Sequence, residues 1–274
     1  MQIGAYAPKE GFTVACCPLE ACGPVVRPSI DEGVFDMCDL VAIATEAHGG
    51  LARYNQFSSA TAHLRVGGSL WRLKGQEGVL SHTAVSIDLY RQSVSHYPYT
   101  APHLRTSFTP HRVAVETSTG EVTAERFDPR ASFPADVRAA WDDLHVAYFA
   151  GYAMWTYLTS PFTFTSPGFR AVELSPVTEQ GEEWRRLKVT FPDHIATHSR
   201  QQVFYFDSDG LLRRHDYTPE VINAGHAAHY VGEYRKFDGI MIPTQRRVYR
   251  RGENGTVFRD VELVTIDIES VLFI

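Results

Sequence analysis

The chain is poor in cysteine, and its only cysteines are Cys16, Cys17, Cys22 and Cys38. Residues beyond Cys38 therefore have no disulfide framework, which is typical of a reducing compartment. Two adjacent cysteines followed by one after four intervening residues match no standard zinc ligand set. The sequence also has no HExxH motif, glycine-rich phosphate loop or serine nucleophile elbow. We therefore expect no metal and no cofactor.

Basic residues are not in excess either, since the net charge is −6. This balance argues against nucleic acid or an anionic membrane as a partner. Long apolar runs are also missing. No apolar signal-peptide region precedes Lys9 and Glu10, and the apolar stretch 146–162 is short, rich in Tyr and Thr, and without basic flanks. The sequence as written predicts a cytoplasmic protein with no transmembrane segment, a poorly structured extension over 1–36 and one domain over 37–274.

What is present is mainly strand pattern. "HRVAVET" and "EVTAERF" flank the turn "STG", "DSDG" divides 201–217, and Asp238-Gly239 divides 227–251. Period-two alternation also runs through 60–75, across a Gly-Gly bend, and through 82–93. The pattern predicts about ten antiparallel strands without βαβ alternation. The expected class is mainly antiparallel β (α+β), an open, unclosed β-barrel.

Two helices are expected to cover the concave face of this barrel. The first spans 39–50, with Asp39 as N-cap and Gly49-Gly50 at its end. The second begins after Asp136 as N-cap and runs to about Thr159. It carries the continuous apolar stripe Trp141, Leu144, Tyr148, Gly151, Trp155 and Leu158, and most of its other positions are apolar as well. A helix that is apolar nearly all round is buried on several sides, so we expect a curved sheet to hold it.

The meander of hairpins, the strand pair "VFYFDSDGLLRRHDY" (203–217) and the late hairpin "YRKFDGIMIPTQRRVYRR" (234–251) resemble the LolA/LolB-like lipoprotein-carrier superfamily. The resemblance covers about residues 39–274. It implies a LolA-like barrel domain over 37–274, with helices over the concave face and a cavity for lipid acyl chains. Carriers of that superfamily are exported and have mainly apolar cavities, whereas the strands of this chain carry many His and Arg residues.

Histidines are the first candidates for chemistry, since the chain has twelve of them. If the hairpins are neighbours, His198, His215 and His229 lie on adjacent strands and converge. Three interpretations stay open: a metal held by three imidazoles, acid-base chemistry near neutral pH, and half-buried histidines bonded to backbone or tyrosine. His215 and Asp216 are adjacent on a strand and face opposite ways, so Asp216 cannot orient His215.

Arginine pairs on the predicted strands are the second candidates. Each pair places one guanidinium on each face of the sheet unless a bulge intervenes. In "LLRRHDY", Leu211 and Tyr217 favour the interior for the face that carries Arg213 and His215. Arg214 and Asp216 are then expected on the outer face.

Two functions are therefore proposed from sequence. The first is binding of a hydrophobic small molecule with an acidic head group in the half-barrel cavity. Its expected contacts are Trp141, Tyr148, Trp155, His198, Arg213 and Tyr217. The alternative is a cofactor-free isomerase, lyase or cyclase. Its proton-transfer candidates are His215, His229, Asp216 and Tyr230. The expected partner is a small apolar or amphipathic molecule, and the oligomeric state stays open.

Overall fold

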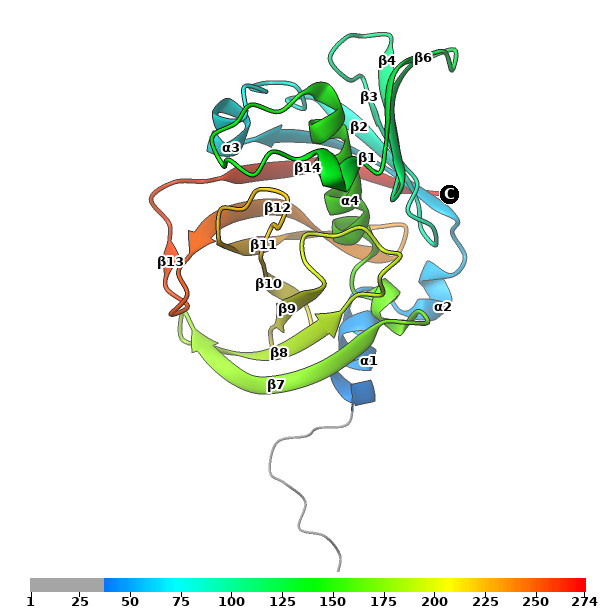
Figure 1. Ribbon diagram of the computed structural model, residues 1–274. Helices are drawn as coiled ribbons and strands as arrows, with labels where there is room; N and C mark the ends of the chain where they lie inside the picture. Colours follow the sequence, from blue (N-terminus) through cyan, green and yellow to red (C-terminus); the bar gives the residue numbers. More distant parts are fainter. Residues whose placement is uncertain (1–36) are drawn as a thin grey trace, which may run out of the picture. The chain divides into compact units, whose positions relative to one another are not determined.

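The computed structural model describes residues 37–274. In this part of the chain, fourteen strands form one antiparallel sheet that curves around helix α4 (Asp143–Thr159), as Figure 1 shows. The strand order is β6-β5-β4-β3-β2-β1-β14-β12-β11-β10-β9-β8-β7, with β13 paired to β12. The edge strands β6 and β7 do not pair with each other, so the sheet is unclosed. The predicted extension over 1–36 lies outside the described residues.

The strands have the following bounds: β1 (Ser59–Gly67), β2 (Thr83–Asp88), β3 (Val94–Tyr97), β4 (Leu104–Thr109), β5 (Arg112–Thr117), β6 (Val122–Phe127), β7 (Arg170–Glu179), β8 (Glu182–Thr190), β9 (Gln201–Phe206), β10 (Leu212–Tyr217), β11 (His226–Phe237), β12 (Ile240–Arg251), β13 (Val257–Phe258) and β14 (Val264–Phe273). The helices besides α4 are α1 (Met37–Ala47), α2 (Leu51–Tyr54) and α3 (Ser69–Leu73), with 3-10 turns η1 (Pro129–Ser132) and η2 (Phe162–Thr165).

The predicted open antiparallel sheet is confirmed, but the expected numbers of strands and helices are wrong. Strands as short as β3 and β13 contain too few residues to show a period of two. The alternation predicted through 60–75 ends at β1, because Gly68 adopts φ 109° and the chain then turns into α3. The second predicted helix begins later than expected. Asp142, not Asp136, is the N-cap of α4, since its carboxylate accepts from the His145 backbone N–H.

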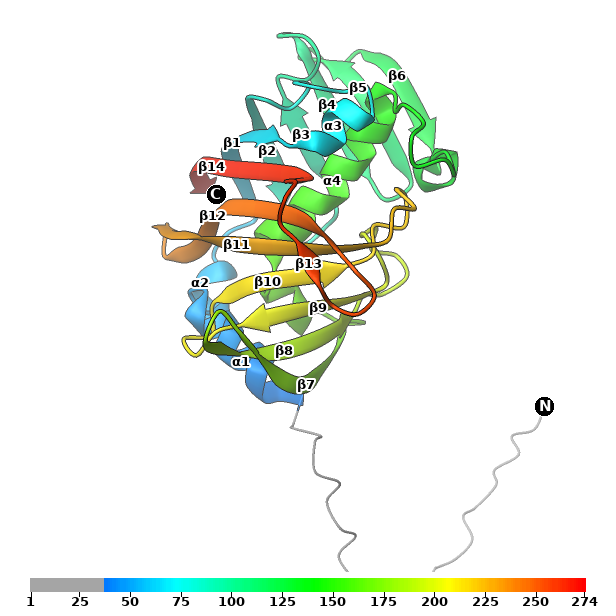
Figure 2. The same ribbon diagram turned by 90° about the vertical axis from the view of Figure 1, so that its left-hand side faces the viewer.

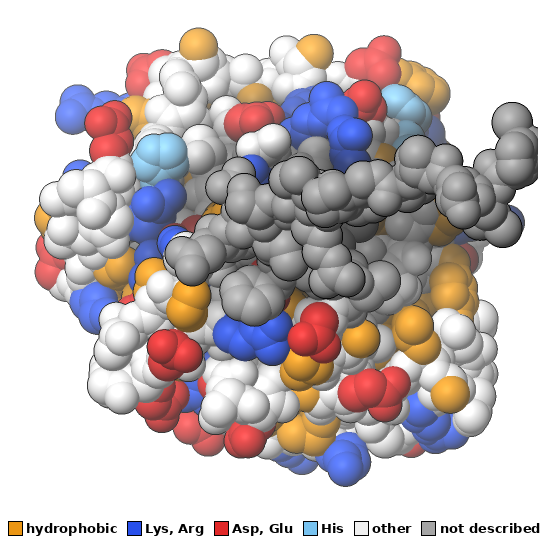
Figure 3. All heavy atoms as spheres, turned by 90° about the horizontal axis from the view of Figure 1, so that it is seen from below, with side chains coloured by type: hydrophobic (Ala, Val, Ile, Leu, Met, Phe, Trp, Pro, Cys, Tyr) orange, Lys and Arg blue, Asp and Glu red, His pale blue; other side chains and the backbone are white. Residues whose placement is uncertain are grey.

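The C-terminal strand β14 joins the two parts of the sheet. It pairs with β1 on one side and with β12 on the other. The hairpins from β1 to β6 and those from β7 to β12 thereby become one layer, and Figure 2 shows β14, β12, β11, β10, β9 and β8 side by side with α4 along one face. On the face shown in Figure 3, acidic and basic side chains are interspersed.

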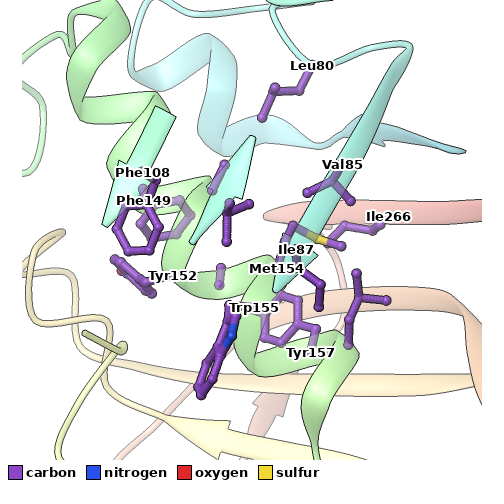
Figure 4. Close-up of a cluster of buried hydrophobic side chains, with 14 of the residues drawn as sticks. Leu80, Val85, Ile87, Phe108, Phe149, Tyr152, Met154, Trp155, Tyr157 and Ile266 are labelled. Atoms are coloured by element: carbon purple, nitrogen blue, oxygen red, sulfur yellow. The ribbon is translucent and has the colours of Figure 1, made fainter. Parts of the chain in front are cut away.

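Helix α4 is enclosed by this layer, as its apolar composition predicts. Every residue from Leu144 to Thr159 is buried, and Figure 4 shows α4 side chains such as Met154 packed against the strands. At Gly151 the helix comes very close to β4, because a Cβ there would lie 2.5 Å from Cγ of Phe108. A second cluster packs α1 against β7, β8 and β9 through residues such as Leu40 and Phe204. Among the described residues, no helix is long and apolar enough to cross a membrane.

Truncating Trp155 should destabilise the whole fold. Its side chain is 2% exposed, and its indole N–H donates to the Asp88 carbonyl at 2.9 Å. We expect Trp155→Ala to lower the unfolding free energy by about 3–5 kcal/mol, as for other large core truncations. The control is Leu272→Ala, which removes a side chain that is 57% exposed. Equal denaturant midpoints for the two variants would contradict this assignment.

Candidate functional site

The three histidines predicted to converge lie in one buried cluster beside α4. Nε2 of His198 is 2.7 Å from the Tyr157 hydroxyl, and the His198 ring stacks on Tyr217 at 3.9 Å. His215 is 4.7 Å from Tyr217 and 6.0 Å from His229, measured between ring centroids. The cluster therefore joins the end of β10, the start of β11 and the C-terminal half of α4.

Both ring nitrogens of His198 and one of His215 are hydrogen-bonded. Nδ1 of His198 is 3.2 Å from the Tyr152 hydroxyl, and Nε2 of His215 is 2.6 Å from Oε1 of Gln202. Neither ring nitrogen of His229 has a partner among the described residues. Within residues 37–274, no group of three or more His, Cys, Asp or Glu side chains is arranged to hold a metal ion.

Burial keeps these imidazoles neutral. Desolvation, with a smaller repulsion from Arg130, lowers the pKa of His198 to about 3. Desolvation and the nearby positive charge of Arg246 also hold the pKa values of His215 and His229 well below the ordinary value of 6.5. At neutral pH the cluster is therefore a set of polar, uncharged groups.

Arg246 on β12 is the charged member of this region. It is 2% exposed, and its Nη2 donates to the Tyr157 carbonyl at 2.9 Å. Its guanidinium also lies 4.9 Å from the centre of the Tyr157 ring. The neighbouring Arg247 pairs with Asp267 at 2.7 Å, so this arginine pair divides between the two faces as the alternation predicts.

The four proton-transfer candidates do not form one site. His215 and His229 are in the cluster beside α4, whereas Asp216 and Tyr230 face the other side of the sheet. There Asp216 accepts from Arg214 at 2.6 Å and from the Tyr205 hydroxyl at 2.9 Å. Tyr230 donates to Glu179 at the end of β7. The sheet backbone therefore separates the two histidines from Asp216 and Tyr230.

The orientation predicted for "LLRRHDY" is confirmed at His215 and Tyr217, which are buried beside α4. Arg214 and Asp216 do lie on the opposite face, but they are buried rather than solvated. Arg213 does not join the buried cluster. The pairing of β10 with β9 shifts register between Leu212 and Arg214, and the Arg213 side chain is 37% exposed with its Nε 3.9 Å from Asp207.

A separate apolar cavity of about 430 Å³ lies between α3, α4 and the ends of β10, β11, β12 and β14. Its lining comprises Ser69, Leu70, Arg72, Leu73, Phe149, Tyr217, Pro219, Ile222, Ala224, Gly225, His226, Ala227, Val248, Arg250, Leu263 and Val264. We call it the α3 cavity. Its exposed basic residues, Arg72 and Arg250, take part in none of the ion pairs found within residues 37–274. The guanidinium of Arg250 lies 4.1 Å from the ring centre of Phe258.

Of the six residues predicted to contact a ligand, one lines the α3 cavity, namely Tyr217. Tyr148 instead lines a more polar cavity of about 490 Å³ beside Arg130 and Glu220. Trp155 is packed in the core, and Trp141 lies beside Lys74, whose Nζ is 5.0 Å from its ring. His198 belongs to the buried cluster, and Arg213 lies at the β9–β10 turn.

Sequence reasoning missed the basic residues and most of the apolar walls of the α3 cavity. The alternation predicted over 60–75 placed Leu70 and Arg72 on a strand. It therefore gave no reason to expect them near the start of β11. Arg250 was noted only as one member of an Arg-Arg pair. The available signal was the pair Gly67-Gly68, which ends β1 and lets α3 begin.

No family model matches the chain, and no curated protein matches it in sequence. Among solved structures, a domain from Vibrio parahaemolyticus named for outer membrane lipoprotein sorting is similar over 85% of this chain and 91% of that chain, with a TM-score of 0.50 and 10% identity. A LolA superfamily protein from Nitrosomonas europaea is similar over 86% and 93%, with a TM-score of 0.47 and 10% identity. The likeness to the Vibrio parahaemolyticus domain confirms the LolA-like fold that the sequence predicts, and at 10% identity it concerns the fold alone.

The buried histidines predict a steep loss of stability in mild acid. A histidine that stays neutral when folded but titrates near pH 6.5 when unfolded lets the unfolded chain bind the extra proton, so stability falls as pH falls below about 7. From pH 7 to pH 5, each such residue should lower the unfolding free energy by about 2 kcal/mol. Urea unfolding at both pH values measures the sum for the buried histidines, which are His48 and His96 as well as the three of this cluster.

The matched variants are His229→Leu and His63→Leu. Removing His229, whose ring nitrogens have no partner in the described residues, should reduce the proton uptake on unfolding by one. Replacing His63, which is exposed on β1, is the control for loss of a histidine side chain at the surface. An unfolding free energy that does not change between pH 7 and pH 5 would refute the neutral, buried state of the cluster.

Proposed function

We propose that the protein binds a hydrophobic small molecule with an acidic head group in the α3 cavity. The observation that carries this proposal is an apolar cavity of about 430 Å³ whose exposed basic residues, Arg72 and Arg250, have no acidic partner among the described residues. This volume lies within the range of about 300–1,000 Å³ that small-molecule sites occupy.

The two ends of such a ligand would be bound by different forces. The apolar part would lie against Leu70, Ile222 and Val248, where each buried CH₂ group contributes about 0.8 kcal/mol. The acidic head would lie at the exposed arginines, since guanidinium groups bind carboxylates through paired, charge-assisted hydrogen bonds. An arginine without a carboxylate partner in the protein loses no ion pair when the ligand binds.

The LolA-like architecture supports this proposal, because helix α4 lies inside a curved sheet and the α3 cavity lies between this helix, α3 and the strand ends. The Vibrio parahaemolyticus domain of similar fold is named for outer membrane lipoprotein sorting. The acid-base alternative has weaker support, since His215 and His229 are separated by the sheet from Asp216 and Tyr230.

Neutralising either exposed arginine should weaken binding of the acid but not of the matching alcohol. We expect Arg72→Gln and Arg250→Gln each to raise the Kd for dodecanoate about three- to tenfold. Binding of dodecanol, which has the same chain and no charge, should change less than about twofold. Isothermal titration calorimetry with both ligands measures this difference.

Two further variants locate the site. Arg91→Gln removes an exposed arginine from the β2–β3 turn and should leave both affinities unchanged. Ala224→Trp places a large side chain at an exposed lining position of the α3 cavity and should abolish binding of both ligands. Dodecanoate binding that survives in Ala224→Trp would assign the ligand to another part of the molecule.

A further inference from the structure

A second, smaller cavity lies beside the α3 cavity. Its volume is about 30 Å³, and it shares the lining residues Phe149, Tyr217 and Val264 with the α3 cavity. The rest of its lining is Val66, Trp71, Leu80, His96, Ala150, Ala153, Met154, Tyr157 and Ile266. We call it the inner cavity. Figure 4 shows several of these side chains around α4, among them Leu80 and Ile266.

Among the side chains that line the inner cavity, His96 on β3 has the one buried polar atom left without a partner. The ring is 1% exposed, and its Nε2 makes no hydrogen bond within residues 37–274. The other polar lining groups are bonded: the Trp71 indole N–H donates to the Gly67 carbonyl at 2.9 Å, and the Tyr157 and Tyr217 hydroxyls are 3.2 Å apart. An unpaired polar group in such a site is costly, so it points to a missing partner.

The neighbour of His96 indicates which kind of partner is missing. The Thr106 hydroxyl oxygen accepts the His96 backbone N–H at 2.8 Å and lies 3.5 Å from Nδ1 of the same ring. The hydroxyl also has one proton of its own, and in one of the two tautomers of the ring it donates this proton to Nδ1. Burial lowers the pKa of His96 to about 4, so the ring is neutral at pH 7. With Nδ1 as acceptor, Nε2 carries the proton and requires an acceptor.

We propose that the amphipathic ligand of the α3 cavity carries a neutral oxygen acceptor on its chain, a keto, ether or hydroxyl oxygen, which accepts a hydrogen bond from Nε2 of His96 in the inner cavity. This inference rests on the proposed function and narrows its substrate class from apolar acids to oxygenated ones. His96 would then determine specificity at the inner end, while the exposed arginines bind the head group.

The expected preference for an oxygenated chain follows from the free-energy cost of leaving a buried N–H donor unpaired. A plain alkyl chain that reaches the inner cavity leaves Nε2 unpaired, whereas a chain with an oxygen at the right carbon pairs it. Sites built to hydrogen-bond one ligand group discriminate strongly against analogues that lack it. The inner cavity is also large enough for one water, which would pair with Nε2 equally well and remove the preference. Binding experiments separate these two cases.

The test uses dodecanoate and a series of dodecanoates that each carry one keto oxygen at successive carbons. For the wild-type chain, calorimetry should show that one position, or two adjacent ones, binds about tenfold more tightly than dodecanoate. In His96→Leu that preference should vanish, so that no keto acid binds more tightly than dodecanoate. The control His63→Leu, on the exposed side of β1, should keep the preference.

The outcomes distinguish the two proposals. If dodecanoate binds but every keto acid binds equally or more weakly, the inference is overturned and the proposed function stands. If dodecanoate does not bind at all, the proposed function fails. Should His96→Leu not fold, ¹⁵N NMR of the wild-type imidazole replaces it. We expect the Nε2–H tautomer at pH 7 and a shift of Nε2 with the preferred keto acid but not with dodecanoate; an Nδ1–H tautomer overturns the assignment.

Discussion

The fold depends on the bond between Arg246 and the end of helix α4. A helix buried along its whole length cannot leave its last carbonyls to water, so the protein must supply their donors. The Tyr157 carbonyl would be paired by the N–H four residues later, but that residue is Pro161, which has none. Arg246 on β12 donates to it instead. The negative end of the helix and the Tyr157 ring together explain how this guanidinium stays buried without a carboxylate.

The polar cluster around His198 follows from the same burial. Thr156 and Thr159 satisfy their hydroxyls within α4, at the Tyr152 and Trp155 carbonyls. Tyr157 has no such partner in the helix, so its hydroxyl pairs with His198 and Tyr217. Uncharged imidazoles suit this position, because a cationic ring would be repelled by Arg246 and would lose its hydration. Packing of α4 therefore accounts for the histidines without requiring them to take part in chemistry.

The sequence predicted those features that depend on neighbouring residues. The hairpins turning at "STG", "DSDG" and Asp238-Gly239 form as expected, since turn chemistry is local. Two kinds of feature were not predictable. The insertion of β14 between β1 and β12 joins residues about 200 positions apart, which no local pattern encodes. The start of α4 was predicted at Asp136, but the reciprocal bond of Asp142 with His145 begins the helix later.

These limits explain why the histidine cluster was found from sequence and most of the cavity residues were not. His215 and His229 lie on the neighbouring strands β10 and β11, and His198 lies in the β8–β9 connection rather than on a strand, so adjacency in sequence implies adjacency in space. The α3 cavity instead combines α3 and β14 with β11 and β12, which become neighbours only because the last strand returns to the middle of the sheet. That return also brings the inner cavity, which is lined by His96 from the first part of the sheet, beside the α3 cavity, which is lined by Arg250. The ligand that we propose for these two cavities is polar at both ends, so the long-range pairing of β14 bears on that proposal as well as on the fold.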